Sequence, residues 1–331
     1  ASLADTFRLT ELFSQIYNPS DFTRFEQMAI LSVTAALSET ALDISNDRTL
    51  FILSTTKGNI NLLEGDSGRK DPGLYLWHSA KRLGELFKFR TDPVVISNAC
   101  ISGLQAVIAG SRLIRAGYYD NVVVNGTDII TEFVVSGFNS FKSLSTGPCR
   151  PFDISRDGLS LGEGSGTIIL TNNHSCLKQD ACIMVGEGYS SNDANHISGP
   201  SRTGEGLFLT VDRIIRKTPA IDFISAHGTG TLYNDEMEAI ALTRAGLHEV
   251  PVNSFKGYWG HTLGAAGVIE LVMCLHTMRN NVLLKTEGYN ISGLKNNLNI
   301  VDRVIYREVK NCLKIASGFG GCNAALYLHR A

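Results

Sequence analysis

Long apolar runs are absent from this chain of 331 residues. No stretch reaches the roughly 20 apolar residues that a membrane-spanning helix needs, and no charged-then-apolar signal segment opens the chain. A surplus of charge of either sign is absent too, because 30 Lys and Arg face 32 Asp and Glu. The sequence therefore indicates a cytoplasmic protein without overall electrostatic affinity for nucleic acid or for an anionic membrane.

Closely spaced cysteines are also missing. The seven cysteines form no CxxC pair, and no group of Cys and His residues has the spacing of a zinc site. We interpret them as reduced thiols of a cytosolic protein and expect no metal site. Six of them are expected to be small buried side chains. The remaining one, Cys100, has a different sequence context.

What the chain does contain is a regular alternation of short apolar runs and segments with helical periodicity. The runs 49–54 and 121–125 predict strands, whereas 22–43, 101–116 and 264–278 predict helices. Strands that alternate with helices favour an α/β fold with layers and largely parallel sheets. The rhythm of the first half is repeated in the second without a low-complexity linker, which favours one fused unit.

Cys100 stands at a predicted junction between the strand PVVIS and the helix that starts at Ile101. Ala99 and Ser102 are small, which suits a tight turn. The positive end of a helix favours a thiolate, and the backbone N–H of Cys100 can help to hold an oxyanion. Taken alone, a buried structural cysteine explains the position as well.

The segment AHGTGT follows another predicted strand and places His227 at the start of a loop of Gly and Thr. Its glycines allow close approach of a ligand, and Thr229 and Thr231 offer hydroxyl groups. Asp235 and Glu238 follow on the next helix. A helix-capping loop with an incidental histidine is an equally good interpretation of this segment.

The segment KGYWGHTLGAAG places His261 just before a helix that opens with small residues. The helix dipole disfavours an imidazolium there, so we expect a neutral ring that exchanges hydrogen bonds. Lys256 lies five residues before it and Glu270 nine after it; a solvated lysine and a helix-face carboxylate are the alternatives. The later GFGG segment, with Phe319, predicts either a plain turn or a mobile flap over a cavity.

These four segments, together with RPFDISRDGLSLGEGSG at 150–166, resemble the β-ketoacyl-[acyl carrier protein] synthases of the thiolase-like superfamily. All five motifs occur in the family's order between about 90 and 330. The resemblance implies a layered α-β-α-β-α sandwich of two pseudo-repeated halves. Residues 1–172 would carry the nucleophile and residues 173–331 the two histidines, in one fused unit.

The resemblance also implies a role for each motif residue. Cys100 would carry the acyl chain as a thioester, and His227 and His261 would promote malonyl decarboxylation and stabilise the resulting oxyanions. Lys256 and Glu270 would support the histidines with their charges, and Asp235 and Glu238 would help to hold Lys256. Thr229 and Thr231 would contact the pantetheine arm, while the backbone N–H groups of Cys100 and Phe319 would form an oxyanion hole. Phe319 would be a gate beside Phe138, and Asp193 and His196 would belong to an entrance loop.

The implied reaction is a decarboxylative Claisen condensation in fatty-acid, polyketide or polyene synthesis, without a cofactor. The implied partners are acyl carrier protein and a second subunit, which makes a homodimer or a heterodimer with a chain-length partner. The basic segment 81–90 and Lys142 are candidates for docking the acidic carrier, and a solvated charged helix is the preferred interpretation of the segment. Two alternatives are a thiolase acting on coenzyme A thioesters, for which Cys322 in GFGGCN was considered, and a non-catalytic chain-length partner.

Overall fold

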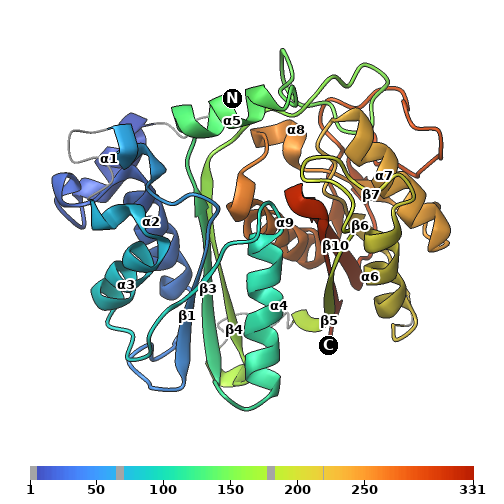
Figure 1. Cartoon of the computed structure of the whole chain (residues 1–331). Coiled ribbons are helices and arrows are strands. Elements are labelled where there is room, and N and C mark those ends of the chain that lie inside the picture. Colours follow the sequence, from blue (N-terminus) through green and yellow to red (C-terminus); the bar gives the residue numbers. More distant parts are fainter. Residues whose placement is uncertain (1–5, 65–70, 177–182, 219) are drawn as a thin grey trace.

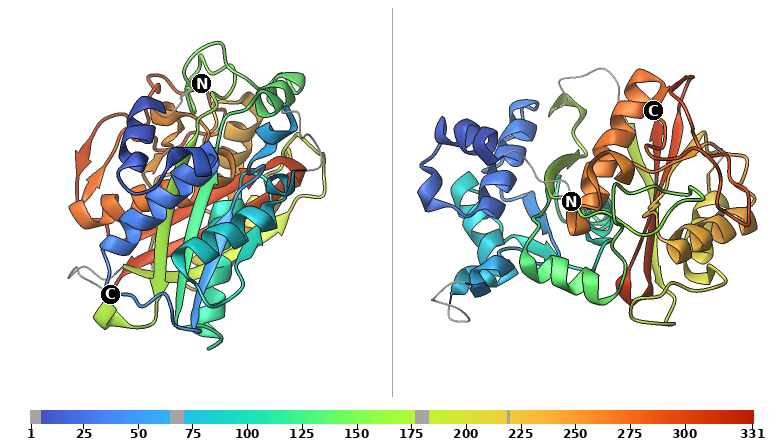
Figure 2. Two further views of the ribbon diagram at one scale, coloured as in Figure 1. Left: turned by 90° about the vertical axis from the view of Figure 1, so that its left-hand side faces the viewer. Right: turned by 90° about the horizontal axis from the view of Figure 1, so that it is seen from above.

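A computed structural model describes residues 6–64, 71–176, 183–218 and 220–331. Two sheets lie side by side with helices between them and on both outer faces (Figure 1). Viewed from above, the layers follow one another across the molecule (Figure 2). The layered arrangement expected from the alternation of strands and helices is therefore present.

The first sheet is built from residues 49–171 and has the order β2-β1-β3-β4. Its strands are β1 (Thr49–Ser54), β2 (Val94–Ile96), β3 (Asn121–Asp128) and β4 (Gly164–Thr171). β1 pairs with β2 and β3 in parallel, but β4 runs antiparallel to β3. The sheet is thus mixed, and the expectation of largely parallel sheets holds only for its first three strands.

The second sheet is built from residues 183–330 and has the order β5-β11-β10-β6-β7. Its strands are β5 (Ile183–Asn192), β6 (Phe223–Ser225), β7 (Val252–Asn253), β10 (Asn311–Gly318) and β11 (Cys322–Arg330). β11 runs antiparallel to both of its neighbours, whereas β6 is parallel to β10 and β7. β10 and β11 form a hairpin, and the GFGG segment makes the turn between them.

The helices form three layers around these sheets. The outer face of the first sheet is covered by α1 (Thr6–Ser14), α2 (Arg24–Ser38) and α3 (Leu76–Phe87). The middle layer consists of α4 (Ser102–Arg115) and α9 (Ala266–Asn280), which pack against each other. The opposite outer layer is α6 (Glu205–Ile215) with α7 (Leu232–Arg244). Smaller elements are α5 (Glu132–Ser140), α8 (Lys256–Trp259) and a two-stranded antiparallel sheet of β8 (Val282–Leu283) and β9 (Ile305–Tyr306).

The buried strand β1 shows why the layers hold together. Leu50 and Ile52 point into the core of the middle layer, whereas Phe51 and Leu53 point into the core beneath α2 and α3. A strand that is covered on both faces needs apolar residues at every position, which is what the run TLFILS supplies. Among the described residues, no helix is long and apolar enough to cross a membrane.

Candidate active site

Three side chains that the motifs singled out meet where β2 and β6 end. Cys100 follows β2, His227 follows β6, and His261 lies shortly before α9. All three are buried, and the Cys100 sulfur and one ring nitrogen of each histidine lie within 4.8 Å of one another. The two imidazole rings meet edge to face with their centroids 5.0 Å apart. The fold therefore brings one thiol and two imidazoles from both halves of the chain into a single group.

This group lines a cavity of about 350 Å³. Predicted residues that also line the cavity are Phe138, Asp193, His196, Thr229, Thr231 and Phe319. Lys256, Asp235, Glu238 and Glu270 are fully buried and are not among the lining residues. The predicted site thus divides into side chains that can touch a ligand and charged side chains behind them.

A sharp turn presents Cys100 to the cavity. Ala99 has φ +44°, in the left-handed region that residues with a Cβ seldom adopt. The hydroxyl of Ser102 holds the turn, because it accepts from the N–H of Asn98 at 2.7 Å and donates to the carbonyl of Ala99 at 2.6 Å. A Cβ on Gly318 would lie 3.0 Å from the Cys100 nitrogen, so the loop before Phe319 can approach only as glycine. The strained turn and the close approach place the thiol beside the GFGG segment.

Burial sets the protonation state of Cys100. It raises the pKa of the thiol to about 12, with Cys322 adding to the rise, while the Lys256 ammonium and the backbone N–H of Phe319 act in the opposite direction. The resting group is therefore a thiol and not the thiolate that the helix N-terminus was expected to favour. The reason is that desolvation of the sulfur anion outweighs the positive charge around it.

The thiol state of Cys100 can be tested by alkylation. We expect iodoacetamide to modify Cys100 slowly at pH 7, at a rate that keeps rising through pH 10, because the thiolate is the reacting species. Peptide mass mapping of the folded protein would follow Cys100, with the partly exposed Cys176 as an internal reference. A rate that levels off near pH 7 would show a preformed thiolate and contradict this assignment.

His227 is held on three sides. Its backbone N–H donates to Glu238 Oε1 at 2.7 Å, and its carbonyl accepts from Lys256 Nζ at 2.6 Å. Lys256 Nζ also lies 3.2 Å from His227 Nδ1. An ammonium has only donors, so Nδ1 must accept and the ring proton belongs on Nε2. His227 is thereby fixed as the tautomer that can donate a hydrogen bond from Nε2.

His261 is positioned by its backbone and leaves its ring unpaired. Its N–H donates to Ser160 at 2.7 Å, and its carbonyl accepts from Gly162 at 3.0 Å. Three residues further on, the N–H of Gly264 donates to the buried Asp128 at 2.7 Å. Within the described part of the chain, neither ring nitrogen of His261 has a hydrogen-bond partner. A buried imidazole without protein partners is available to a ligand.

Both rings are neutral near pH 7. Burial lowers the pKa of His227 and of His261 well below 6.5, and the ammonium of Lys256 lowers both further. The neutral state expected for His261 is therefore confirmed, with burial as its main cause. A pair of neutral imidazoles can donate hydrogen bonds to a developing oxyanion without carrying charge in the resting state.

Lys256 belongs to a buried cluster that includes a residue the motifs did not indicate. Glu270 Oε1 accepts from Lys256 Nζ at 2.6 Å, and Glu270 Oε2 lies 2.6 Å from Lys314 Nζ. Burial raises the pKa of the Glu270 carboxyl, but the two ammoniums outweigh it and hold this pKa below its usual value. Lys314 lies within the run CLKIAS of β10, where it is the one charged residue. A single charge within a predicted buried strand could have indicated this residue from the sequence.

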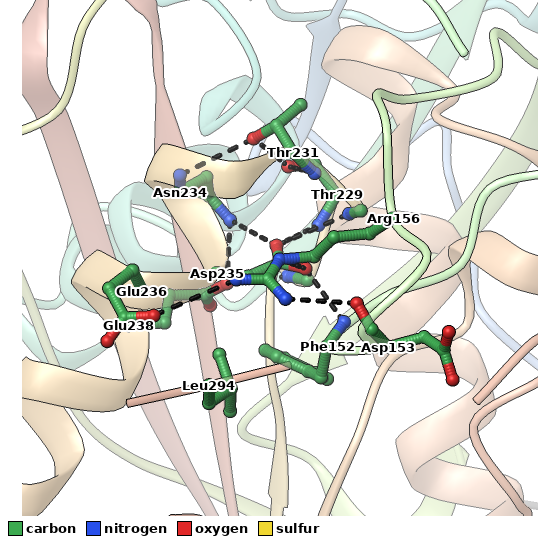
Figure 3. A network of polar contacts seen from close by, with 12 residues as sticks. Phe152, Asp153, Arg156, Thr229, Thr231, Asn234, Asp235, Glu236, Glu238 and Leu294 are labelled. Carbon is green, nitrogen blue, oxygen red and sulfur yellow. Dashed lines mark hydrogen bonds and ion pairs between the residues drawn. The ribbon is translucent and has the colours of Figure 1, made fainter. Parts of the chain in front are cut away.

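Asp235 and Glu238 differ from expectation in what they hold. Asp235 accepts from the N–H groups of Thr229 and Phe152, at 3.0 and 2.8 Å, and Glu238 accepts from those of His227 and Gly228. Figure 3 shows Asp235 and Glu238 in this network. No described hydrogen bond joins either carboxylate to Lys256. Backbone N–H groups and the side chain of Asn234 thus occupy both carboxylates. They hold the HGTGT loop directly, and the predicted help in holding Lys256 is limited to the attraction between the charges of Glu238 and Lys256.

An aromatic cluster closes one side of the cavity. The ring of Phe319 stacks on that of Phe138, with centroids 5.4 Å apart, and meets that of Phe141 edge to face at 5.2 Å. Phe138 was predicted at this place, whereas Phe141 was missed. Phe141 follows Phe138 by three residues, one turn further along the chain, and that spacing could have indicated it.

Two hydroxyl groups and the entrance loop also line the cavity. Thr229 Oγ1 and Thr231 Oγ1 lie 2.9 Å apart, and Thr231 also caps α7 by accepting from the Asn234 N–H. His196 Nδ1 accepts from the N–H groups of Ser198 and Gly199. That ring nitrogen is therefore engaged in shaping its own loop. Of the other cysteines, Cys182 lies outside the described residues, Cys176 is partly exposed, and the rest are buried.

Comparison with known proteins places this geometry in a family. Residues 2–175 match the sequence profile of the β-ketoacyl synthase N-terminal domain, and residues 181–290 match that of its C-terminal domain. The tetracenomycin polyketide synthase ketoacyl synthase alpha subunit of Streptomyces glaucescens is 30% identical, over 94% of this chain and 82% of that protein. The 3-oxoacyl-[acyl-carrier-protein] synthase 2 of Rhizobium meliloti is 32% identical, over 78% of this chain and 66% of that protein.

Solved structures share the fold. The ishigamide ketosynthase/chain length factor superposes with a TM-score of 0.84, at 24% identity over 95% of this chain and 84% of the other. A ketosynthase in complex with its chain length factor from Xenorhabdus doucetiae gives a TM-score of 0.76, at 25% identity over 100% of this chain and 85% of the other. The thiolase-like layered fold expected from the motifs is thereby confirmed. With two matched profiles that together span most of its length, the chain belongs to the β-ketoacyl synthase family of condensing acyltransferases.

Proposed function

We propose that this chain takes an acyl group from acyl carrier protein onto Cys100 and condenses it with malonyl-acyl carrier protein, with loss of CO₂. One observation carries the proposal: the buried Cys100 sulfur lies within 4.8 Å of one ring nitrogen of each of two neutral histidines. A soft nucleophile that forms a thioester and a pair of donors for an oxyanion are what such a reaction requires.

In the first half-reaction the Cys100 sulfur attacks the thioester carbonyl of the donor. The C–S bond to the pantetheine arm breaks, and the thiol proton leaves with the departing pantetheine sulfur. The backbone N–H groups of Cys100 and Phe319 are the proposed donors to the tetrahedral oxyanion. The N–H of Phe319 already points to the sulfur of Cys100, which supports this role.

In the second half-reaction the C–C bond to the malonyl carboxylate breaks and CO₂ departs. The electron pair moves to the thioester oxygen, and His227 Nε2–H and the ring of His261 are the proposed hydrogen-bond donors to it. The enolate carbon then attacks the Cys100 thioester, and the Cys100 sulfur leaves and regains a proton. Donors fixed in a dry pocket stabilise such a charge far better than water does.

Acyl carrier protein and a second subunit are the partners that we propose. The relatives' names support both, since one is a 3-oxoacyl-[acyl-carrier-protein] synthase and one is an alpha subunit, and a structural neighbour is a ketosynthase in complex with its chain length factor. Lys142 is exposed at the cavity mouth and can face an acidic carrier. Within the segment 81–90, Arg82 is instead paired with Glu26. We place the reaction in the cytoplasm, which the free state of the six described cysteines supports.

A turnover assay separates this proposal from its alternatives. With acyl- and malonyl-acyl carrier protein and the partner subunit present, we expect a β-ketoacyl product and one CO₂ for each condensation. Acyl exchange with coenzyme A and no release of CO₂ would instead indicate a thiolase. Cys322 does not line the cavity, which argues against the thiolase hypothesis. No turnover by this chain, alongside stimulation of another synthase, would indicate a chain-length partner.

A further inference from the structure

Lys314 is a fully buried lysine that none of the motifs includes. It lies in the middle of β10, where Leu313 and Ile315 point into the core beneath α6 and α7. Cys312 and Ala316 point the other way, into the core of the middle layer. Because side chains alternate along a strand, Lys314 also points to the middle layer, where it meets Glu270 of α9.

The cluster around Glu270 carries more positive than negative charge. Two ammoniums, those of Lys256 and Lys314, share the single carboxylate of Glu270, each at 2.6 Å. The buried carboxylates of Asp235 and Glu238 accept hydrogen bonds from backbone N–H groups and from Asn234, and no described hydrogen bond joins them to either lysine. Taken by itself, the Lys256–Glu270–Lys314 cluster therefore carries one net positive charge.

Stability alone does not account for this arrangement. Taking a charge out of water is costly, and replacing a buried ion pair by apolar residues is often neutral or stabilising. The neighbours of Lys314 on its strand are apolar, so an apolar side chain would suit the strand. A second buried lysine at such a place indicates a use other than holding the fold together.

Lys314 also contacts the strand that leads to His227. Its Nζ donates to the carbonyls of Ser225 and Ala226, at 3.3 and 3.0 Å. These are the last two residues before His227, so one side chain joins Glu270 to the end of β6. A change at Lys314 therefore reaches both the charge and the position of the histidine pair.

We propose that Lys314 is a second positioning lysine, which completes a Lys256–Glu270–Lys314 cluster and keeps His227 and His261 neutral for malonyl decarboxylation. The role as a positioning residue in that reaction rests on the proposed function above, but the effect on the histidines does not. A positive charge beneath the rings makes a second positive charge on them unfavourable. The same charge favours the negative charge that decarboxylation places above the rings.

The surroundings of the rings support this assignment. Burial is the main cause that lowers the pKa of both histidines, followed by Lys256 and, for His227, by His261; Lys314 acts in the same direction on both. The titratable and charged groups around the pair include Cys100, Asp128, Asp235, Glu238, Lys256, Glu270 and Lys314. Among the cations in this set, Lys314 is the one that the known motifs leave without a role.

Histidine titration measured by NMR tests the charge effect without any substrate. The variants are Lys314→Gln, which can still donate to the two carbonyls but has no charge, and Lys314→Arg, which keeps the charge. Lys310→Met is the matched control, since Lys310 lies just before the same strand but is exposed. We expect His227 and His261 to titrate at higher pH in Lys314→Gln, and to stay at the wild-type position in Lys314→Arg and Lys310→Met.

Unchanged histidine titration in a folded Lys314→Gln protein would overturn the proposal, as would an equal shift in Lys314→Arg. Lys314→Met serves as the neutral variant if thermal unfolding shows that Lys314→Gln does not fold. In the decarboxylation assay we expect the acid limb of the pH profile to move to higher pH, with a loss of about tenfold at pH 7. If the wild-type protein decarboxylates nothing, the proposed function fails, and the NMR result still decides the role of Lys314.

Discussion

Cys100→Ala is expected to abolish condensation and to leave malonyl decarboxylation largely intact. Without the sulfur no acyl thioester forms, so condensation should fall by about 10⁵-fold or more, as for other covalent nucleophiles. The histidines and the cluster behind them are untouched, so CO₂ release from malonyl-acyl carrier protein should stay within about tenfold of wild type. The measurement is the rate of product formation beside the rate of CO₂ release.

Cys322→Ala is the matched control for this experiment. Cys322 is also a buried thiol, and its Sγ donates to the carbonyl of Phe319 at 3.3 Å. Because it does not line the cavity, we expect the variant to retain acylation and condensation. Loss of condensation in Cys322→Ala together with retention in Cys100→Ala would reverse the assignment of the nucleophile.

His261→Ala is expected to separate the two half-reactions. The variant removes one of two donors to the enolate oxygen, which should slow malonyl decarboxylation by about 10²–10³-fold. Acyl transfer to Cys100 depends on the backbone donors of Cys100 and Phe319 and should lose far less. The two rates can be compared by CO₂ release and by the rate at which the acyl-enzyme appears.

His196→Ala supplies the comparison for that variant. His196 lines the cavity but uses Nδ1 to hold its own loop, so we expect a small effect of similar size on both half-reactions. Equal losses of acyl transfer and decarboxylation in His261→Ala would instead indicate a structural role for His261. That outcome would contradict the role proposed for the histidine pair.

The sequence motifs predicted much of the site because they lie at the ends of buried strands. A run such as IDFISA predicts a strand, and the next residue, His227, then lies at the strand's carboxyl end. The helix α4 and the strand β1 were also predicted close to their observed bounds. The helix predicted over 22–43 is shorter, because α2 ends at Ser38.

Other features depend on contacts across the fold and have little local signal. The short helix α5 contains two valines and a glycine, which are weak helix formers, and it was not predicted. Asp128 is the last residue of β3, but its partner Gly264 is remote in the sequence. The state of Cys100 depends on the depth of burial, which a pattern of residues does not reveal. The hydrogen bonds that join Asp235 and Glu238 to the HGTGT loop likewise depend on three-dimensional contacts and were not predicted.

The central claim is that Cys100 carries the acyl chain, and intact-protein mass spectrometry tests it most directly. The folded chain, with its partner subunit, is mixed with acyl carrier protein thioesters of short, long and unsaturated acyl groups. We expect a covalent adduct with the mass of the acyl group, mapping to Cys100 and absent from Cys100→Ala. No adduct from any donor, or an adduct that maps to Cys322, would contradict the claim.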